Sequence, residues 1–467
     1  MILLNGKKEE IDLPPEVTYI SNTDMKALGS QVIESAKSKG ADMVEVYLNN
    51  DRELYIEVRE GRVETMKLAG ERGLGLRLVK GNQVGFAYTS DLNPESIQSV
   101  VDQALVNAAN TVEDPYLVVP EPASQYPELD LYDSTIMDTS VEEKINLAKV
   151  MEEEAKKHDS RVKIIEGSTY TDAETEVTLM NSLGVDLGYR GTYSGIYIAL
   201  VAVQGEENQT GFALNYSLKY KDLNAKSTGR EATTRAVRML GARTVSSQKV
   251  PVLLEPYVAI GFLGLLAPAL TAEAVQKGRS LFADKRGQKV ASEKISIIDD
   301  GSLPGGIASA PFDGEGVPTS RTKLITGGVL QGFLHNTYTA AKEGVKSTGN
   351  GVRGSFKSTP EVGATNFFIE KGTTDPSEMV AGLKNGFYVT EVLGMHTANP
   401  ISGDFSLGAV GLMIENGSIA YPVRGVALAG NIIEMMKNIE GVGNDLTFFG
   451  GRGAPTLLIG EMALSGH

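Results

Sequence analysis

Apolar residues near the start of the chain first recur with a helical period and then alternate with polar ones. Polar residues precede a predicted helix over 24–39, and Gly40 follows it. One face of this helix carries Met25, Leu28, Val32 and Ala36. Strand-like runs follow at 44–48, 54–58, 63–68, 73–79 and 84–88. A second helix begins at Asn93-Pro94, because proline suits the first helical position.

The same order of elements then repeats. Ser140 and Glu143 form a capping-box pattern that opens a helix to about Lys157. Strand-like runs follow at 162–166, 176–181, 185–189 and 194–203, then from 211, and a helix over 229–240 closes the segment. Gly211-Phe212-Ala213 repeats Gly85-Phe86-Ala87. The pattern predicts a duplicated helix–antiparallel meander–helix unit, with helices on one face of the sheets.

The pattern changes near residue 246, where longer Gly-rich strand and turn signals begin. Thr326-Gly327-Gly328 and Asn416-Gly417 are hairpin signals, because type I′ turns need positive φ at both central residues. We therefore predict an α+β chain whose last domain is mostly β with a few helices. The expected boundaries are 22–112 for the first repeat, 113–138 for an extended connection, 139–245 for the second repeat and 246–467 for the third domain.

Two segments have simple structural interpretations. Gly73-Leu74-Gly75 lacks the third glycine of a dinucleotide-binding loop, so a strand packed close to another backbone is favoured. The apolar stretch from Pro256 to Ala272 is shorter than the ~20 residues that span a bilayer, and it contains Pro268. We interpret it as a buried helix or helix pair, and we expect no membrane association.

Charge and cysteine content restrict the functional classes. The formal net charge is −15 and no basic stripe offsets it, which disfavours nucleic acids as partners. The chain has no Cys, so it has neither disulfides nor thiolate ligands. The first ten residues lack the apolar core of a signal peptide. We therefore expect a cytoplasmic protein.

Few residues indicate catalytic chemistry. The chain has no HExxH, Walker A or Gly-x-Ser-x-Gly motif, and its four histidines are His158, His335, His396 and His467. His396, in the loop 394–403, is the one candidate for a functional role, whereas His335 after the strand 329–334 favours a structural one.

Five charged residues in the third domain remain ambiguous. Asp313 and Glu315 fit either an acid–base pair or a tight Gly-rich turn, and we favour the turn. Asp404 is equally ambiguous. Arg321 and Arg353 could hold a carboxylate or a peptide carbonyl.

An ordered set of motifs in the third domain resembles the TldD/PmbA family. The set runs through 303–319, 346–351, 390–391, 401–406, 415–417, 421–423, 429–431 and 442–445, and the stretch 73–89 fits the family's first domain. The resemblance covers nearly the whole chain. It implies one of two branches: TldD subunits carry HExxxH on a helix and a Cys ligand, whereas PmbA (TldE) subunits lack both and pair with TldD.

The position of the missing motif can be assigned from the resemblance. Placed on the TldD pattern without gaps from the anchor 280–292, the HExxxH span falls on 263–268. Leu263 and Pro268 then replace the histidines, and Gly264 replaces the catalytic glutamate. None of these side chains can bind zinc or activate water. The resemblance is therefore to the PmbA/TldE branch, and we expect no metal, no cofactor and no catalytic residue.

The leading hypothesis is a subunit of a heterodimeric peptidase without activity of its own. The resemblance implies that a TldD-type partner cleaves unfolded or leader peptides in a shared cavity. Five residues are candidates for lining the peptide site or the interface: Arg321, Asn350, Arg353, His396 and Asp404. The alternatives are a homodimer that binds peptides without cleaving them, and an enzyme with a relocated metal site that uses His335 and His396.

Overall fold

The computed structural model describes residues 2–4, 7–9 and 22–466, which form two compact units. Unit 1 contains the described residues up to Asp114, together with Asp130–Leu240 and Gly354–Thr359. Unit 2 contains Pro115–Leu129, Gly241–Arg353 and the described residues from Pro360 onward. Near the start of the chain, β1 (Ile2–Leu4) and β2 (Lys7–Glu9) form a two-stranded antiparallel ladder.

Unit 1 is built on one six-stranded antiparallel sheet in the order β5-β4-β3-β6-β7-β8. The strands are β3 (Met43–Arg59), β4 (Arg62–Lys80), β5 (Gln83–Thr89), β6 (Val162–Asn181), β7 (Asp186–Gln204) and β8 (Glu207–Ser217). Each repeat supplies a three-stranded meander, and β3 pairs with β6 from Glu45↔Asn181 to Val58↔Ser168. The predicted duplication is confirmed, and its two halves form one continuous sheet.

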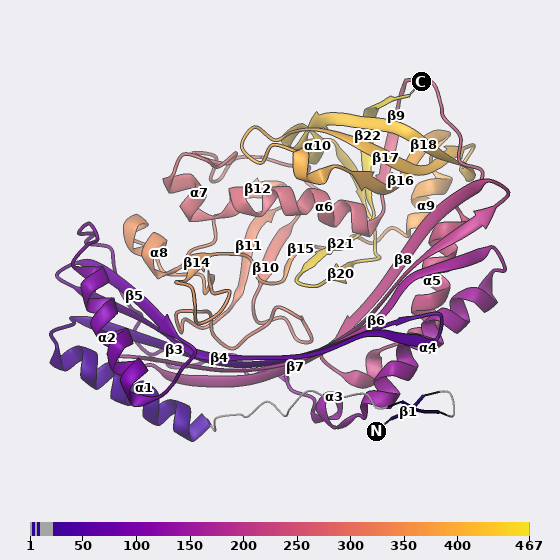
Figure 1. The fold of residues 1–467 in the computed structure, drawn as a ribbon. Helices are drawn as coiled ribbons and strands as arrows, with labels where there is room; N and C mark the ends of the chain where they lie inside the picture. The colour runs from indigo at the N-terminus through magenta and orange to yellow at the C-terminus, as the bar shows by residue number, and fades with distance from the viewer. Residues whose placement is uncertain (1, 5–6, 10–21, 467) are drawn as a thin grey trace. The chain divides into compact units, whose positions relative to one another are not determined.

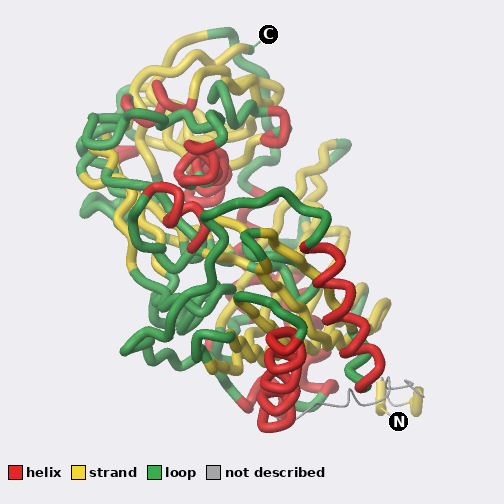
Figure 2. The backbone as a smooth tube through the Cα atoms, turned by 90° about the vertical axis from the view of Figure 1, so that its left-hand side faces the viewer, coloured by secondary structure: helices red, strands yellow, loops and turns green. Residues whose placement is uncertain are grey.

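Four helices pack on one face of this sheet, as Figures 1 and 2 show. They are α1 (Asn22–Ser38) and α2 (Pro94–Ala108) on the first meander, with α4 (Val141–His158) and α5 (Ala225–Val237) on the second. The side chain of Asn93 caps α2 and that of Ser140 caps α4. Each helix pair covers its own hydrophobic core, so apolar burial holds each repeat together.

The predicted division of each meander into short strands was wrong. The runs 44–48 and 54–58 belong to the single strand β3, and β4, β6 and β7 each join two predicted runs. The polar residues 49–53 looked like a break, yet they continue the ladder in the centre of the sheet. Residues of the predicted connection cover this centre: Thr192 N donates to Leu131 O (2.9 Å), and α3 (Ser134–Asp138) follows.

Glycines allow close backbone approaches at three strand positions. A Cβ on Gly85 would lie 1.9 Å from the carbonyl oxygen of Ala104 in α2, and one on Gly211 would lie 2.3 Å from that of Ala232 in α5. The repeated Gly-Phe-Ala motif thus marks where a helix crosses a strand. A Cβ on Gly75 would lie 2.2 Å from the carbonyl oxygen of the buried Phe356, which confirms the predicted close packing of the strand 73–79.

Unit 2 contains two six-stranded sheets. The first, in the order β18-β17-β16-β9-β22-β19, comprises β9 (Gln248–Leu254), β16 (Asn385–Leu393), β17 (Asp404–Glu415), β18 (Ser418–Asn431), β19 (Ile439–Val442) and β22 (Leu457–Ser465). The second, in the order β12-β11-β10-β15-β21-β20, comprises β10 (Ile297–Asp300), β11 (Arg321–Thr326), β12 (Val329–Leu330), β15 (Phe367–Ile369), β20 (Thr447–Phe449) and β21 (Arg452–Ala454). Both predicted hairpins are present, with positive φ at Gly327 and Gly328 and at Asn416 and Gly417.

Helix α6 (Pro256–Leu266) packs against strands of both sheets in the core of unit 2 (Figure 1). The apolar stretch does not continue as one helix to Ala272, because Pro268 has no N–H with which to extend it. A 3-10 turn, η2 (Pro268–Leu270), and a short helix, α7 (Ala272–Gln276), complete the stretch. Within the described ranges, no helix is both long and apolar enough to cross a lipid bilayer.

Candidate functional site

Unit 2 contains a cleft of about 870 Å³ at the C-terminal end of α6. Its wall begins at Ala267 and Pro268 and continues along η2 and α7. The other sides come from the backbone segment 362–365, the tip of the loop at Pro400 and Ile401, and the turn from Phe449 to Arg452. The lining is therefore mostly apolar side chains and backbone, with a few charged groups, as is usual for ligand sites.

One side of the cleft depends on Gly264. A Cβ on this residue would lie 2.9 Å from Nη1 of Arg452, so the guanidinium lies over the bare backbone of α6. Arg452 belongs to β21, and its side chain is exposed and lines the cleft. Phe449 is held beside it by an edge-to-face contact with Tyr257 of α6 (ring centroids 5.2 Å apart).

The α7 wall carries the other charged groups. Thr271 caps α7, because its hydroxyl accepts the N–H of Ala274 (3.2 Å) and donates to Pro268 O (2.8 Å). Glu273 and Lys277 form an ion pair one turn apart. Arg279 follows α7 with an exposed side chain. The lining thus carries three cations and one carboxylate, although the whole chain is strongly acidic.

Asn350 and Asp299 hold the backbone wall 362–365 in place. The Asn350 side-chain amide donates to Asp299 Oδ2 (2.7 Å) and to Gly363 O (3.0 Å). Asp299 also accepts the N–H of Thr365 (2.6 Å). Burial raises the pKa of Asp299, and these donors act in the opposite direction. Asn350, a residue singled out from the sequence, therefore lies behind the cleft wall and positions it.

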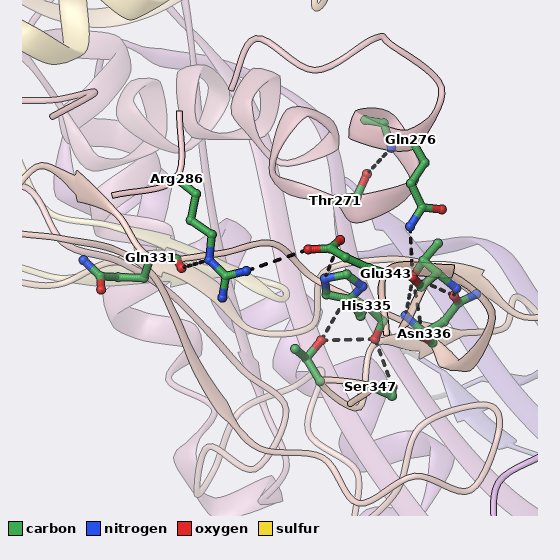
Figure 3. A network of polar contacts seen from close by, with 11 residues as sticks. Thr271, Gln276, Arg286, Gln331, His335, Asn336, Glu343 and Ser347 are labelled. Carbon is green, nitrogen blue, oxygen red and sulfur yellow. Dashed lines mark hydrogen bonds and ion pairs between the residues drawn. The ribbon is translucent and has the colours of Figure 1, made fainter. Parts of the chain in front are cut away.

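A polar network around His335 supports the α7 side from behind (Figure 3). The backbone oxygen of His335 accepts a hydrogen bond from the Ser347 hydroxyl (3.0 Å). The ring Nε2 of His335 lies 3.6 Å from Glu343 Oε2. Gln276 of α7 donates to Thr339 O (2.9 Å) in α8 (Thr337–Glu343). Burial lowers the pKa of His335, so the neutral ring is favoured. These contacts support the structural interpretation of His335.

The acidic residues Asp313 and Glu315 form the turn that we favoured. Asp313 Oδ1 accepts the N–H groups of Glu315 (2.9 Å) and Val317 (3.0 Å), and its Oδ2 accepts the Gly351 N–H (2.8 Å). Burial and the neighbouring Glu315 raise the pKa of Asp313. Both carboxylates accept hydrogen bonds from buried backbone, so their observed contacts are structural.

The remaining sequence candidates lie around the cleft without lining it. Arg321 pairs with Glu370 (2.6 Å), and Arg353 Nε donates to Gly314 O (2.6 Å). Asp404 accepts from the Asn431 amide (2.9 Å), which lowers the pKa of Asp404 and fixes the loop that carries Ile401. His396 is exposed on η3 (Met395–Thr397). Their roles in peptide or partner contact stay predictions.

The three positions of the missing motif lie in different surroundings. Leu263 is 1% exposed in the core of unit 2, Gly264 lies under Arg452, and Pro268 lines the cleft. None of these side chains carries a donor atom, so a zinc ion does not fit at this helix. Across residues 2–4, 7–9 and 22–466, no three His, Asp or Glu side chains form a group able to hold a metal, and His335 and His396 belong to none.

Sequence reasoning did not identify Arg452 and Arg279 as site residues. Both lie in polar, Gly-containing segments that look like ordinary surface turns. The informative feature of Arg452 is its position over Gly264, which is far away in the sequence. No pattern within either segment could have revealed this contact.

Comparisons with known proteins agree across most of the chain. Three family models match: PmbA/TldA metallopeptidase domain 1 over residues 44–108, the central domain over 136–240 and the C-terminal domain over 247–466. Metalloprotease PmbA of Escherichia coli O157:H7 is 30% identical over 93% of this chain and 94% of its own length.

Two solved structures have the same fold. A Thermotoga maritima protein described as a modulator of a DNA gyrase has a TM-score of 0.88 and 30% identity, and the match covers 94% of this chain and 100% of that one. TldE from Thermococcus kodakarensis has a TM-score of 0.87 at 23% identity, again over 94% and 100% of the two chains, which shows the fold alone. The chain belongs to the PmbA/TldD metallopeptidase family, and its relatives named PmbA are consistent with the PmbA (TldE) branch.

Proposed function

We propose that this chain is the PmbA/TldE-like subunit of a heterodimeric peptidase and holds unfolded or leader peptides that a TldD-type partner cleaves. The observation that carries the proposal is the end of α6. The segment that would carry metal ligands in the partner ends instead at a cleft, with Gly264 and Pro268 at two of the three motif positions beside it. The helix of the family fold is present at this position, but its side chains carry no metal donor atoms.

The cleft wall offers a means of holding an extended peptide. Ala364 lines the cleft, and its peptide N–H and C=O have no hydrogen-bond partner within the described part of the chain. The adjacent β14 (Glu361–Val362) pairs with only two residues of β13 (Gly351–Val352). An extended peptide could pair with this backbone as an added strand, which requires no particular side-chain sequence. Such binding suits a subunit that accepts many unfolded peptides.

The test is a cleavage assay with both subunits. An equimolar mixture of this chain and a TldD-type partner should degrade an unfolded labelled peptide faster than the partner alone, and the two should elute as one complex. Ala364→Pro removes the free N–H and should reduce the rate of the mixture without dissociating the complex. Ala364→Gly, which keeps the N–H at the same position, is the matched control.

A mixture no faster than the partner alone would contradict the proposal. If the chain by itself elutes as a dimer and binds peptide, the homodimeric binding protein replaces it. We also propose a cytoplasmic location, supported by the absence of Cys.

A further inference from the structure

The guanidinium of Arg452 is an exposed charge in the cleft. Its Nη1 atom lies next to Gly264 of α6, in space that the side chain of a larger residue would fill. Within residues 22–466, no carboxylate pairs with Arg452. The exposed guanidinium therefore keeps its N–H donors available to a ligand in the cleft.

The charges around Arg452 do not neutralise it. Glu273 pairs with Lys277 on the next turn of α7, and it forms no ion pair with either arginine of the cleft. Arg279 adds a second guanidinium to the lining, and among the described residues it also has no carboxylate partner. Two other exposed arginines of unit 2 do have carboxylates within reach: Arg286 lies 3.7 Å from Glu343, and Arg321 lies 3.7 Å from Asp300 and 2.6 Å from Glu370.

We infer that the cleft recognises a carboxylate of the bound peptide, which Arg452 receives and which Arg279 attracts through its charge. The inference rests on the proposed function, because it names the chemical group of the peptide that this cleft selects. A guanidinium binds a carboxylate through two parallel N–H···O bonds, and Phe449 and Pro268 beside it supply apolar surface for the neighbouring part of the peptide. The carboxylate is either the C-terminus of the peptide or an Asp or Glu side chain.

Four labelled peptides separate these sources. The reference is a short dansyl-labelled peptide of Ala, Gly, Ser and Phe with a free C-terminal carboxylate; the dansyl group carries no carboxylate of its own. The second peptide has the same sequence with an amidated C-terminus. The third is the amidated peptide with one internal Glu, and the fourth is the amidated peptide with Gln in place of that Glu. Binding to the full chain is measured by fluorescence anisotropy at low salt. We expect the free carboxylate or the internal Glu to strengthen binding roughly tenfold over its neutral twin.

Substitutions in the chain assign the effect to Arg452. Arg452→Gln should remove the preference for the carboxylate-bearing peptides over their neutral twins, whereas Arg452→Lys should retain part of it. Gly264→Glu should also abolish the preference, because its carboxylate would reach the same guanidinium; Gly264→Ala controls for bulk. Arg62→Gln, which removes an exposed arginine of unit 1, controls for net charge.

The outcomes distinguish the two proposals. If all four peptides bind equally well, or if Arg452→Gln weakens all four alike, carboxylate recognition is overturned while peptide binding stands. If none of the peptides binds, the proposed function fails and the inference fails with it.

Discussion

The sheet centre of unit 1 and the cleft of unit 2 both place charged side chains among apolar ones, but they treat them differently. In unit 1, Lys144 of α4 is 1% exposed and lies 2.6 Å from Asp172, which is completely buried. In the cleft, Arg452 and Arg279 have no carboxylate partner among the described residues. A buried charge that pairs with an opposite charge of the same chain supports the fold, whereas an unpaired charge in a cleft is available to bind a ligand.

The buried pair allows the strongest test of this contrast. Lys144→Met leaves Asp172 in the core with only Arg52 nearby (3.4 Å), so it should lower the free energy of unfolding by about 3 kcal/mol. Urea unfolding of the full chain measures the loss. The double variant with Asp172→Leu should recover part of this loss, because the buried carboxylate is then gone and the guanidinium of Arg52 is partly exposed. A single variant as stable as the native chain would show that the pair does not support the fold.

A second test concerns backbone crowding in the same sheet. Gly85→Ala places a Cβ 1.9 Å from Ala104 O, so α2 must shift, and we expect a loss of about 2 kcal/mol in urea unfolding. Gly191→Ala on β7 is the matched control, because its Cβ would meet atoms no closer than 3.6 Å. Equal stabilities of the two variants would contradict the close-approach role of the repeated glycine.

A third, smaller effect depends on pH and concerns the support of the cleft. Burial lowers the pKa of His335 below its ordinary value of 6.5. Below pH 6.5 the His335 ring is protonated in the unfolded chain but stays neutral in the folded chain. The free energy of unfolding should therefore decrease as the pH falls below this value. Between about pH 7.5 and pH 5, the free energy of unfolding should change less with pH in His335→Gln than in the native chain. Chemical unfolding at each pH measures this dependence. Parallel slopes would mean that His335 titrates normally.

The smallest effect is expected at an exposed ion pair. Arg321 and Glu370 are 2.6 Å apart, yet their side chains are 43% and 42% exposed. Glu370→Gln removes this exposed pair and leaves the contact of Arg321 with the buried Asp300, so it should change the free energy of unfolding by no more than about 0.5 kcal/mol, because water screens exposed pairs. Thermal unfolding of this variant and of Lys144→Met, measured under the same conditions, compares the contributions of the exposed and the buried ion pair. A loss as large as that of the buried pair would remove the contrast between exposed and buried charges.

Local patterns in the sequence predicted the elements whose determinants are local. The caps at Asn93 and Ser140, both hairpins and the duplication are encoded within short segments. The length of β3 could not be read, because residues 49–53 are polar and yet lie inside a sheet whose cover comes from residues 130–139. The cleft was missed for the same reason: Gly264 and Arg452 meet only in the folded unit.

The most direct test of the account is the fate of a peptide incubated with this chain alone. The labelled reference peptide is mixed with the full chain, with zinc and separately with EDTA, and its binding and mass are followed together. We expect the peptide to bind and stay intact under both conditions, because Leu263, Gly264 and Pro268 offer no metal donor. Cleavage that requires zinc and stops with EDTA would contradict the account.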